Sequence, residues 1–256
     1  MTTAKEQFDR QASHYNAQWN AWTESSLQWL LTHAAAQPAD DVLDVATGTG
    51  FTALAFAPLV RTVVGLDVST GMLARARQHQ AALGLTNVSW QEGAAEALPF
   101  AAGTFSLVSC RIAPHHFESV PQFLAEVTRV LRPGGRFVLA DTTVPDHDPA
   151  TADWQNGVEA LRDPSHRRNL APRQWRQALT TAGLTVAALD VPGGEVPMQL
   201  HDWLEKAGTA PEPAAAVRAA FAQAPAAARA AFQIQALPAD DYTFIWQRLV
   251  ALATRS

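Results

Sequence analysis

The sequence predicts an α/β protein with a Rossmann-like, doubly wound and mostly parallel seven-stranded sheet, an antiparallel last strand, N-terminal helices and a helical insertion. Short apolar runs alternate with helical patterns from residue 40 onward, which is typical of a parallel sheet covered on both faces. A glycine-containing turn at residues 47–50 follows the first apolar run. The 256 residues are 48% hydrophobic and 17% charged, which suits one α/β domain with a substantial core.

The central strands and helices follow from the change between apolar runs and helical spacing. The predicted strands are residues 42–46, 62–67, 88–91, 105–110 and 136–141. The predicted helices are residues 51–59, 69–80 and 120–131. Residues 132–135, Arg-Pro-Gly-Gly, have the composition of a turn before the fifth strand. We expect the crossover connections between these strands to be right-handed.

The N-terminal segment is also predicted to be helical. Residues on one helix face recur there at spacings of three and four, namely Phe8, Ala12, Tyr15, Trp19 and Trp22. Thr23 or Ser25 is placed to cap a second helix over residues 27–31.

The pattern changes after residue 141. Residues 144–172 are polar, with three prolines between residues 145 and 164, and we expect them to cover the core rather than join it. The later predicted elements are a helix at 173–181, a sixth strand at 184–191, helices at 200–206 and 213–232, and a last strand at 242–252.

We expect residues 1–256 to form one domain with three parts. Residues 1–36 would form a helical lid and residues 40–142 a cofactor-binding core. Residues 143–256 would supply the cover, the sixth strand, the helical insertion at 196–236 and the last strand.

Composition excludes several classes of protein. The net charge is −5, whereas proteins that grip nucleic acid through phosphates usually carry a basic excess. Cys110 is the only cysteine, so disulfides within the chain and multi-thiolate metal sites are excluded. No apolar run approaches the roughly 18 residues of a membrane span, and the N-terminus lacks a secretory-signal pattern. We expect a cytoplasmic enzyme acting on a small molecule, with no nucleic-acid or membrane partner; the oligomeric state is not readable.

Two aspartates flank the glycine turn. Asp44 precedes Gly48 and Gly50, and Asp67 ends the second predicted strand, 23 residues after Asp44. An acid in the position of Asp67 accepts hydrogen bonds from both hydroxyls of a ribose. A carboxylate just before the glycines suits a cationic amino-acid group better than a pyrophosphate. The pair predicts a site for S-adenosylmethionine, the alternative being that Asp44 and the glycines only tighten a turn.

Five stretches occur in an order and spacing that resemble a known family. They are residues 8–15, 42–50, 65–69, 93–100 and 126–135. With them the chain resembles class I S-adenosylmethionine-dependent methyltransferases, in particular the ubiquinone/menaquinone-biosynthesis-like small-molecule group. The resemblance spans roughly residues 8–189. It implies methyl transfer from S-adenosylmethionine to an O, N or C atom of a small-molecule acceptor by in-line displacement.

The resemblance also implies the residues that contact the donor. Asp67 would bind the ribose, Val68 and Met72 would flank the adenine, and the backbone N–H of Ala95 would donate to the ring. Cys110 and Arg111 would lie beside the methionine part. The full expected cofactor set is Asp44, Ala46, Gly48, Gly50, Asp67, Val68, Met72, Ala94, Ala95, Cys110, Arg111 and Tyr15. The chain departs from many relatives at Ala94 and Ser106, where they carry aspartate.

His115 and His116, after the fourth strand, are the expected catalytic residues. Either is a candidate base for an acceptor that must lose a proton; the alternative is that both only pack or cap a helix. His14 and Tyr15 are candidate lid residues. No metal site is expected, because Cys110, His115 and His116 are too crowded and too mixed for zinc.

Two further groups have open alternatives. Trp19, Trp22 and Trp29 either line an apolar acceptor pocket or, as we favour, belong to the core. A second group either holds an anionic part of the acceptor or, as we favour, is solvated surface; it consists of His147, His166, Arg162, Arg167 and Arg168.

Two other functions are alternatives to methyl transfer. A nicotinamide-dependent oxidoreductase uses a similar glycine turn, since Gly48 to Ala53 fits the dinucleotide pattern. A non-catalytic S-adenosylmethionine-binding module predicts donor binding without turnover.

Overall fold

The protein, described here as a computed structural model that covers residues 4–11 and 17–256, is built around a seven-stranded sheet. The strand order is β3-β2-β1-β4-β5-β10-β6. The strands are β1 (Asp41–Val45), β2 (Thr62–Asp67), β3 (Val88–Glu92), β4 (Phe105–Arg111), β5 (Leu131–Thr142), β6 (Leu184–Asp190) and β10 (Arg248–Arg255). Strands β1 to β5 pair in parallel, and β10 lies antiparallel between β5 and β6. The predicted fold class is confirmed.

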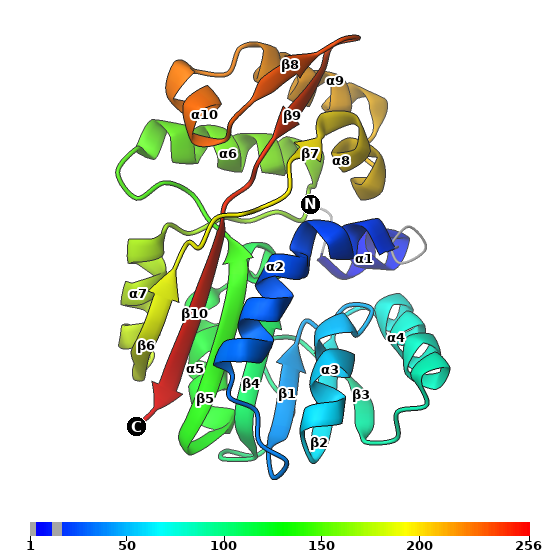
Figure 1. The fold of residues 1–256 in the computed structure, drawn as a ribbon, viewed down its shortest axis with the longest axis vertical. Coiled ribbons are helices and arrows are strands. Elements are labelled where there is room, and N and C mark those ends of the chain that lie inside the picture. The colour runs from blue at the N-terminus through cyan, green and yellow to red at the C-terminus, as the bar shows by residue number, and fades with distance from the viewer. Residues whose placement is uncertain (1–3, 12–16) are drawn as a thin grey trace.

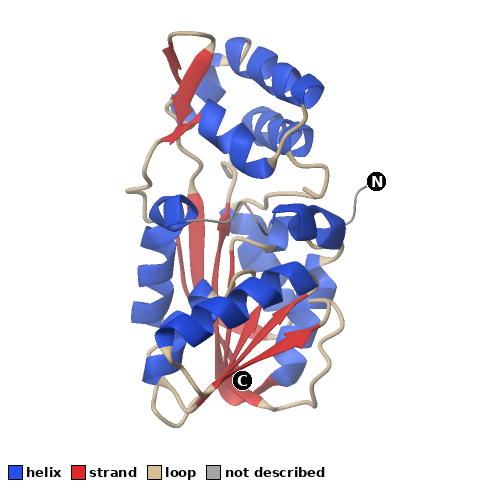
Figure 2. Cartoon of the chain, turned by 90° about the vertical axis from the view of Figure 1, so that its right-hand side faces the viewer, coloured by secondary structure: helices blue, strands red, loops and turns tan. Residues whose placement is uncertain are grey.

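Helices cover both faces of this sheet (Figures 1 and 2). On one face, α2 (Ala17–His33) and α3 (Phe51–Phe56) bury Leu30 and Phe56 against Val42 and its neighbours. On the other, α5 (Val120–Val130) and α7 (Pro172–Thr181) bury Phe123 and Trp175. Helix α4 (Thr70–Leu83) packs beside β3. Because neighbouring strand residues point to opposite faces, covering both faces requires the continuous apolar runs seen in the sequence.

A cap lies beyond the carboxyl ends of the parallel strands, toward which the arrows of β1 and β5 point in Figure 1. We use this name for α6 (Pro149–Arg162), β7 (Met198–Gln199), α8 (Leu200–Ala207), α9 (Pro211–Ala222), α10 (Ala226–Ala231), β8 (Gln235–Leu237) and β9 (Asp241–Phe244). Its short strands form a second sheet in the order β7-β9-β8. The cap has its own apolar core around Trp203, Phe221, Phe232, Phe244 and Trp246.

The chain ends differently from the prediction. The expected last strand at 242–252 is wrong, because it divides into β9, in the cap, and β10, in the main sheet. Tyr242 and Phe244 are strand formers, but their cross-strand partners and aromatic contacts belong to the cap. The single helix expected over residues 213–232 is also wrong. Pro225 separates α9 from α10, since proline cannot continue a helix hydrogen-bond ladder.

Two smaller predictions also differ. No helix begins at Thr23 or Ser25, because α2 runs unbroken from Ala17 to His33. The helix expected over residues 51–59 ends at Phe56 and continues as a 3₁₀ turn (η1, Ala57–Leu59) that contains Pro58. Among the described residues, no helix is long and apolar enough to cross a membrane.

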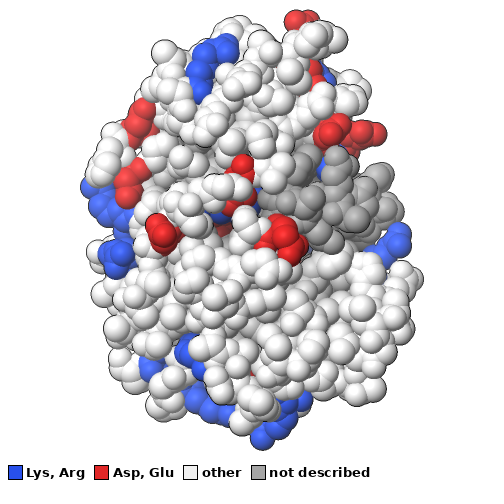
Figure 3. Space-filling view, viewed as in Figure 1, with Lys and Arg blue, Asp and Glu red and all other residues white. Residues whose placement is uncertain are grey.

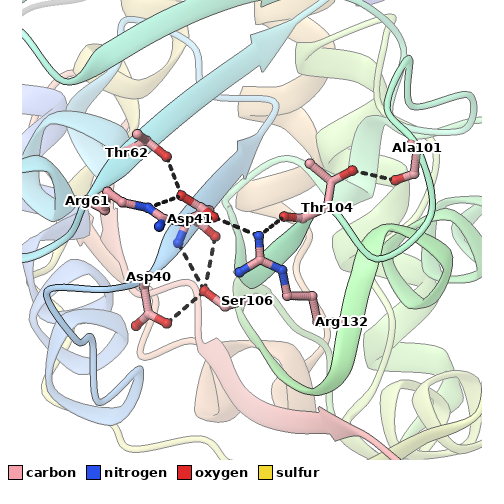
Figure 4. A network of polar contacts seen from close by, with 8 residues as sticks. All are labelled: Asp40, Asp41, Arg61, Thr62, Ala101, Thr104, Ser106 and Arg132. Atoms are coloured by element: carbon pink, nitrogen blue, oxygen red, sulfur yellow. Dashed lines mark hydrogen bonds and ion pairs between the residues drawn. The ribbon is translucent and has the colours of Figure 1, made fainter.

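A polar network ties the amino ends of the strands together (Figure 4). Ser106 Oγ accepts from the backbone N–H of Asp41 at 3.0 Å and donates to Asp40 Oδ1 at 2.7 Å. Arg61 and Arg132 both pair with Asp41, and the hydrogen bonds from Arg61 hold the pKa of that carboxyl well below its usual range. Figure 3 shows basic side chains gathered at the lower end of the molecule. The hydroxyl of Ser106 links the Asp40 carboxylate to the Asp41 backbone, at a position where another aspartate would add a third negative charge.

We predict that Gly65→Ala destabilises the fold. Gly65 on β2 pairs with Trp90 on β3, and a Cβ at Gly65 would lie 2.4 Å from the indole. The free energy of unfolding from urea titration should fall by about 1–3 kcal/mol, the usual cost of overpacking. Gly157→Ala is the control, since Gly157 is exposed in α6 with no atom in the way; it should raise that free energy by about 0.5–1 kcal/mol. Equal values for both variants would contradict the packing account.

Candidate active site

A cavity of about 400 Å³ opens at the carboxyl ends of β1, β2 and β4. Ten of the predicted site residues line it, namely Asp44, Ala46, Gly48, Asp67, Val68, Met72, Ala94, Ala95, Arg111 and His116. They come from strand ends that are far apart in the sequence. Ala46 and Ile112, which follow β1 and β4 and both line the cavity, have φ of 53°, a region that non-glycine residues rarely adopt. Such strain clusters at functional sites.

Asp44 is held rigidly at the floor of this cavity. Its two carboxylate oxygens accept hydrogen bonds from Thr47 Oγ1 at 2.6 Å and from Ser109 Oγ at 2.7 Å. Burial raises the pKa of Asp44 to about 6, despite these hydrogen bonds and the nearby Arg111. A carboxylate removed from water in this way favours a cationic partner that keeps it ionised.

Asp67 joins the ends of β1 and β2. Its Oδ2 accepts from the backbone N–H of Gly48 at 2.8 Å, and its Oδ1 accepts from that of Ser69 at 2.9 Å. Burial raises the pKa of Asp67 to about 6 as well. Each oxygen retains a second lone pair, so the carboxylate can accept further hydrogen bonds from a ligand.

The two glycines of the turn have different roles. Gly48 has φ +55°, lines the cavity, and would direct a Cβ into open space. Gly50 is not among the residues that line the cavity, and its contact with the cofactor stays a prediction. A Cβ at Gly50 would lie 2.6 Å from the Trp90 ring, and its φ is +88°. The sequence therefore needs this second glycine for packing and for a left-handed turn.

Cys110 also lies away from the cavity lining, and its place beside the methionine part stays a prediction. Side chains alternate across β4, so Ser109 and Arg111 reach Asp44 and Thr52, whereas Cys110 points into the apolar core of the other face. It is fully buried and does not line the cavity, and burial raises the pKa of its thiol well above the usual value.

A second, narrower chamber of about 50 Å³ lies between the sheet and the cap. Aromatic and charged side chains from both parts line it, namely Phe8, Ile112, His115, His116, Thr142, Glu159, Arg162, Asp163, Met198, Trp203, Trp246 and Arg248. Phe8, Ile112 and His116 line both cavities. His115 lines only the chamber, so the two candidate histidines are not equivalent.

The two histidines have different hydrogen-bond partners, a carboxylate for His115 and a hydroxyl for His116. His115 Nδ1 lies 2.6 Å from Asp141 Oδ1, and the backbone N–H of His115 donates to Asp141 Oδ2 at 3.0 Å. Burial lowers the pKa of His115, but Asp141 outweighs it and the net shift is upward. His116 Nδ1 lies 3.0 Å from Ser165 Oγ, and burial together with His115 lowers the pKa of His116 to about 3.

Helix α1 (Ala4–Gln11) closes over the larger cavity. Lys5 Nζ donates to the Val68 carbonyl at 2.8 Å, and Asp9 accepts from Ser69 Oγ at 2.5 Å. The Phe8 ring meets His116 edge-on at 4.9 Å. Tyr15, His14 and the side chains of Trp19 and Trp22 lie outside the described residues. Trp29 packs against the core under α2 and stacks on His33, as favoured.

The surface interpretation of the polar segment is wrong for two residues. His166 is buried, its Nε2 lies 3.0 Å from Asn156 Oδ1, and burial lowers its pKa to about 2. Arg162 is buried in the chamber, stacked 4.3 Å over the Trp203 ring. His147 and Arg168 are exposed, and Arg167 pairs with Glu118. The cap buries a segment whose composition is that of surface.

Sequence reasoning missed the residues that partner the histidines. Asp141 ends a predicted strand, and its position at the carboxyl edge of the sheet could have indicated a place in the site. Asp163 and Ser165 follow α6, and nothing in their local pattern indicates a contact with His116. Within the described residues, one group of possible metal ligands, His201, Asp202 and Glu205 on α8, lies outside both cavities.

Comparison with known proteins identifies the family. Residues 42–135 match a family model described as a methyltransferase domain. The uncharacterized methyltransferase YcgJ of Bacillus subtilis is 39% identical over 168 residues, which are 66% of this chain and 65% of that protein. Its crystal structure has a TM-score of 0.84 at 30% identity and covers 91% of this chain and 98% of that chain. The chain belongs to the S-adenosylmethionine-dependent methyltransferase family.

Other members of the family extend the comparison. A structure of a putative methyltransferase from Bacillus halodurans has a TM-score of 0.83 at 31% identity, and covers 90% of this chain and 99% of that chain. A demethylmenaquinone methyltransferase of Symbiobacterium thermophilum is 35% identical over 153 residues, 55% of this chain and 59% of that protein. The chain thus spans under two thirds of that relative. Family membership confirms the predicted enzyme class and methyl donor, and it disfavours the nicotinamide-dependent alternative.

We predict that Cys110 in the folded methyltransferase is inert to Ellman's reagent. The thiol is fully buried and its pKa is raised, so it supplies neither access nor thiolate. The native protein should show no fast reacting thiol, and the protein unfolded in guanidinium chloride should show one. Rapid stoichiometric reaction of the native protein that S-adenosylhomocysteine blocks would place Cys110 in the cofactor cavity after all.

Proposed function

We propose that this protein transfers a methyl group from S-adenosylmethionine, bound in the larger cavity, to an O, N or C atom of a small molecule in the adjacent chamber. The observation that carries the proposal is the pair of buried carboxylates, Asp44 and Asp67, on either side of the Gly48 turn. Both face a cavity of about 400 Å³ in a fold shared with methyltransferases.

The adenosine half of the donor is assigned to β2 and its neighbours. Asp67 would accept hydrogen bonds from both ribose hydroxyls through its remaining lone pairs. Val68 and Met72 would flank the adenine, and the backbone N–H of Ala95 would donate to the ring. Ala94 offers no side-chain acceptor to the adenine amino group.

The methionine half is assigned to β1 and β4. Asp44 would attract the ammonium group, while Ala46 and Gly48 would pass close to the amino-acid chain. Arg111, whose Nε donates to Thr52 Oγ1 at 2.9 Å, is placed to face the donor carboxylate. Tyr15 stays a predicted lid contact.

Alignment is the main source of acceleration in this reaction. The sulfonium is already a good leaving group, so the protein has to hold the acceptor atom in line with the methyl group. The reaction consumes the sulfonium charge, and an environment with few waters favours that change. Helix α1 and the cap, which roof the two cavities, would exclude water.

The proposed division of the chain follows from these positions. Within one methyltransferase domain, residues 1–36 act as a lid, residues 40–142 bind the donor, and the cap within residues 143–256 holds the acceptor. The acceptor chamber combines a wall of Met198, Trp203 and Trp246 with charged groups, which suits a partly apolar molecule with polar substituents. We propose a cytoplasmic location, with no nucleic-acid partner, on the net charge of −5.

We predict that Asp67→Ala weakens S-adenosylmethionine binding by about 1–3 kcal/mol, or roughly 5- to 150-fold in Kd by calorimetry. The variant loses the charged acceptor for the ribose. Asp190→Ala, which removes an exposed carboxylate at the end of β6, should leave Kd unchanged. An unaltered Kd in Asp67→Ala would remove the ribose role. A wild type that binds the donor yet releases no S-adenosylhomocysteine with any acceptor would support the non-catalytic module.

We predict that donor affinity falls at acidic pH. In the free protein the pKa values of Asp44 and Asp67 are both about 6, because of burial, so both carboxyls protonate below that pH. A cationic donor favours the ionised forms. The Kd should be flat above pH 7 and rise below pH 6, by up to about tenfold per pH unit for each carboxyl. Asp67→Asn removes one titration and should flatten the rise; an identical profile in that variant would contradict the assignment.

A further inference from the structure

His115 and His116 are adjacent in the chain and in space, with ring centroids 4.2 Å apart, yet their hydrogen-bond partners are separate. His115 is bound to Asp141 at the end of β5. His116 is bound to Ser165, whose hydroxyl donates to Asp163 Oδ1 at 2.6 Å. Asp163 and Ser165 lie in the segment that links α6 of the cap to α7 on the main sheet.

The hydrogen atoms that Ser165 and Asp163 carry determine which atom donates in the hydrogen bond between His116 and Ser165. Asp163 Oδ1 accepts both the Ser165 hydroxyl at 2.6 Å and the Ser165 backbone N–H at 2.9 Å. Burial raises the pKa of Asp163, whereas Arg162 and the two hydrogen bonds from Ser165 lower it and favour the ionised carboxylate. An ionised carboxylate only accepts, so the single hydroxyl hydrogen of Ser165 goes to Asp163. His116 Nδ1 must then be the donor to Ser165 Oγ.

His116 is therefore the tautomer with its hydrogen on Nδ1. A neutral imidazole with its hydrogen on Nδ1 carries a lone pair on Nε2. With Nδ1 occupied by Ser165, Nε2 is the nitrogen that is left for a ligand. His116 is also the histidine that lines both the donor cavity and the chamber.

It is unfavourable for both rings to be protonated to imidazolium at the same time. Asp141 stabilises the imidazolium of His115, and a second imidazolium at 4.2 Å in a buried site would be strongly disfavoured. A proton that arrives at His116 Nε2 is therefore better placed farther along the chain. Ser165 and Asp163 offer a route that ends on a carboxylate and leaves His116 neutral.

We propose that His116, Ser165 and Asp163 form a proton relay that deprotonates the methyl acceptor, which is therefore an alcohol, phenol or amine whose O–H or N–H hydrogen is lost. The proposal rests on the proposed function, since the acceptor must sit between the donor and His116. In the balanced step, the acceptor atom bonds to the methyl carbon as the carbon–sulfur bond breaks and its electrons go to sulfur. The acceptor proton moves to His116 Nε2, the Nδ1 proton to Ser165, and the Ser165 proton to Asp163.

His116 is the catalytic residue of this relay, and Ser165 and Asp163 are positioning residues that fix its tautomer. Because both residues directly follow α6, the position of the cap helps to place the relay as well as to cover the chamber. Without Ser165, Nδ1 would lose its acceptor, and His116 would be free to place its hydrogen on Nε2.

The first test reads the tautomer directly and needs no acceptor. Heteronuclear NMR of protein labelled at the histidine nitrogens distinguishes a protonated ring nitrogen from one with a lone pair. The expected result for His116 at pH 7 is hydrogen on Nδ1 and a lone pair on Nε2, with His116→Gln used to identify its signals. Ser165→Ala should shift His116 toward the Nε2–H form, and Ser165→Thr, which keeps the hydroxyl, should not.

Two controls separate this result from a general structural effect. Thr62→Ala removes a hydroxyl–carboxylate bond of the same kind, to Asp41 at the opposite end of the sheet, and should leave the His116 signals unchanged. Calorimetry with S-adenosylhomocysteine should give the same Kd for wild type, Ser165→Ala and Thr62→Ala. Loss of this binding in the wild type would contradict the proposed function, whereas the tautomer result stands independently of it.

The second test addresses the acceptor class. Release of S-adenosylhomocysteine is measured with small phenols, alcohols and amines, and with thioethers and carboxylates, which have no hydrogen to lose at neutral pH. Turnover is expected only with the first group, and Ser165→Ala should lower kcat at least about tenfold with an unchanged KM for the donor. An Nε2–H tautomer in the wild type, an Ala variant with normal kcat, or turnover confined to the second group would overturn the relay.

Discussion

The site depends on the burial of two carboxylates at the carboxyl edge of the sheet. Removing Asp44 and Asp67 from water is unfavourable, and their pKa values near 6 express that cost. Hydrogen bonds from Thr47, Ser109 and two backbone N–H groups offset part of it and fix the carboxylates in place. A cationic ligand would offset the rest. The cavity is thereby organised for a positively charged molecule before that molecule arrives.

Carboxylates lie at both ends of the parallel strands, but they are paired differently at the two ends. At the amino ends, Asp41 is matched by Arg61 and Arg132, and Ser106 bridges to Asp40. The carboxylates at that end are therefore paired with arginines of the chain itself. At the carboxyl ends, the carboxylates face a cavity, and the backbone at Ala46 and Ile112 is held in the left-handed region. Backbone strain and buried carboxylates are concentrated around this cavity, as expected for a functional site.

The cap changes the chemistry available at that edge. The donor cavity is made almost entirely by the sheet and its connections, together with α1. The chamber, by contrast, combines His115 and His116 after β4 with side chains from α6, α8 and the segment after β9. A cap with its own apolar core can vary its lining without disturbing the sheet. Under the proposed function, changes in the cap would alter the acceptor chamber while the sheet kept the donor cavity.

Local sequence determined the sheet and the residues of the proposed donor site. Apolar runs, the Gly48 turn and the acids at strand ends have short-range signatures, because strand burial and turn geometry are set by neighbouring residues. Parallel strands then bring Asp44 and Asp67 to one edge whatever the details of the loops. Even so, a pattern does not show which of two adjacent side chains faces a cavity and which faces the core, as Cys110 and Arg111 at the end of β4 illustrate.

Only the tertiary structure decided the chamber. His166 and Arg162 belong to a segment that looks like solvated surface, and they are buried because the cap folds over them. The partners of the histidines show the same limit, since Ser165 lies 49 residues from His116 and their contact depends on how the cap packs on the sheet. Likewise the strand formers at Tyr242 and Phe244 joined the cap rather than the main sheet. Contacts of this kind depend on long-range packing, for which a single sequence carries no local signal.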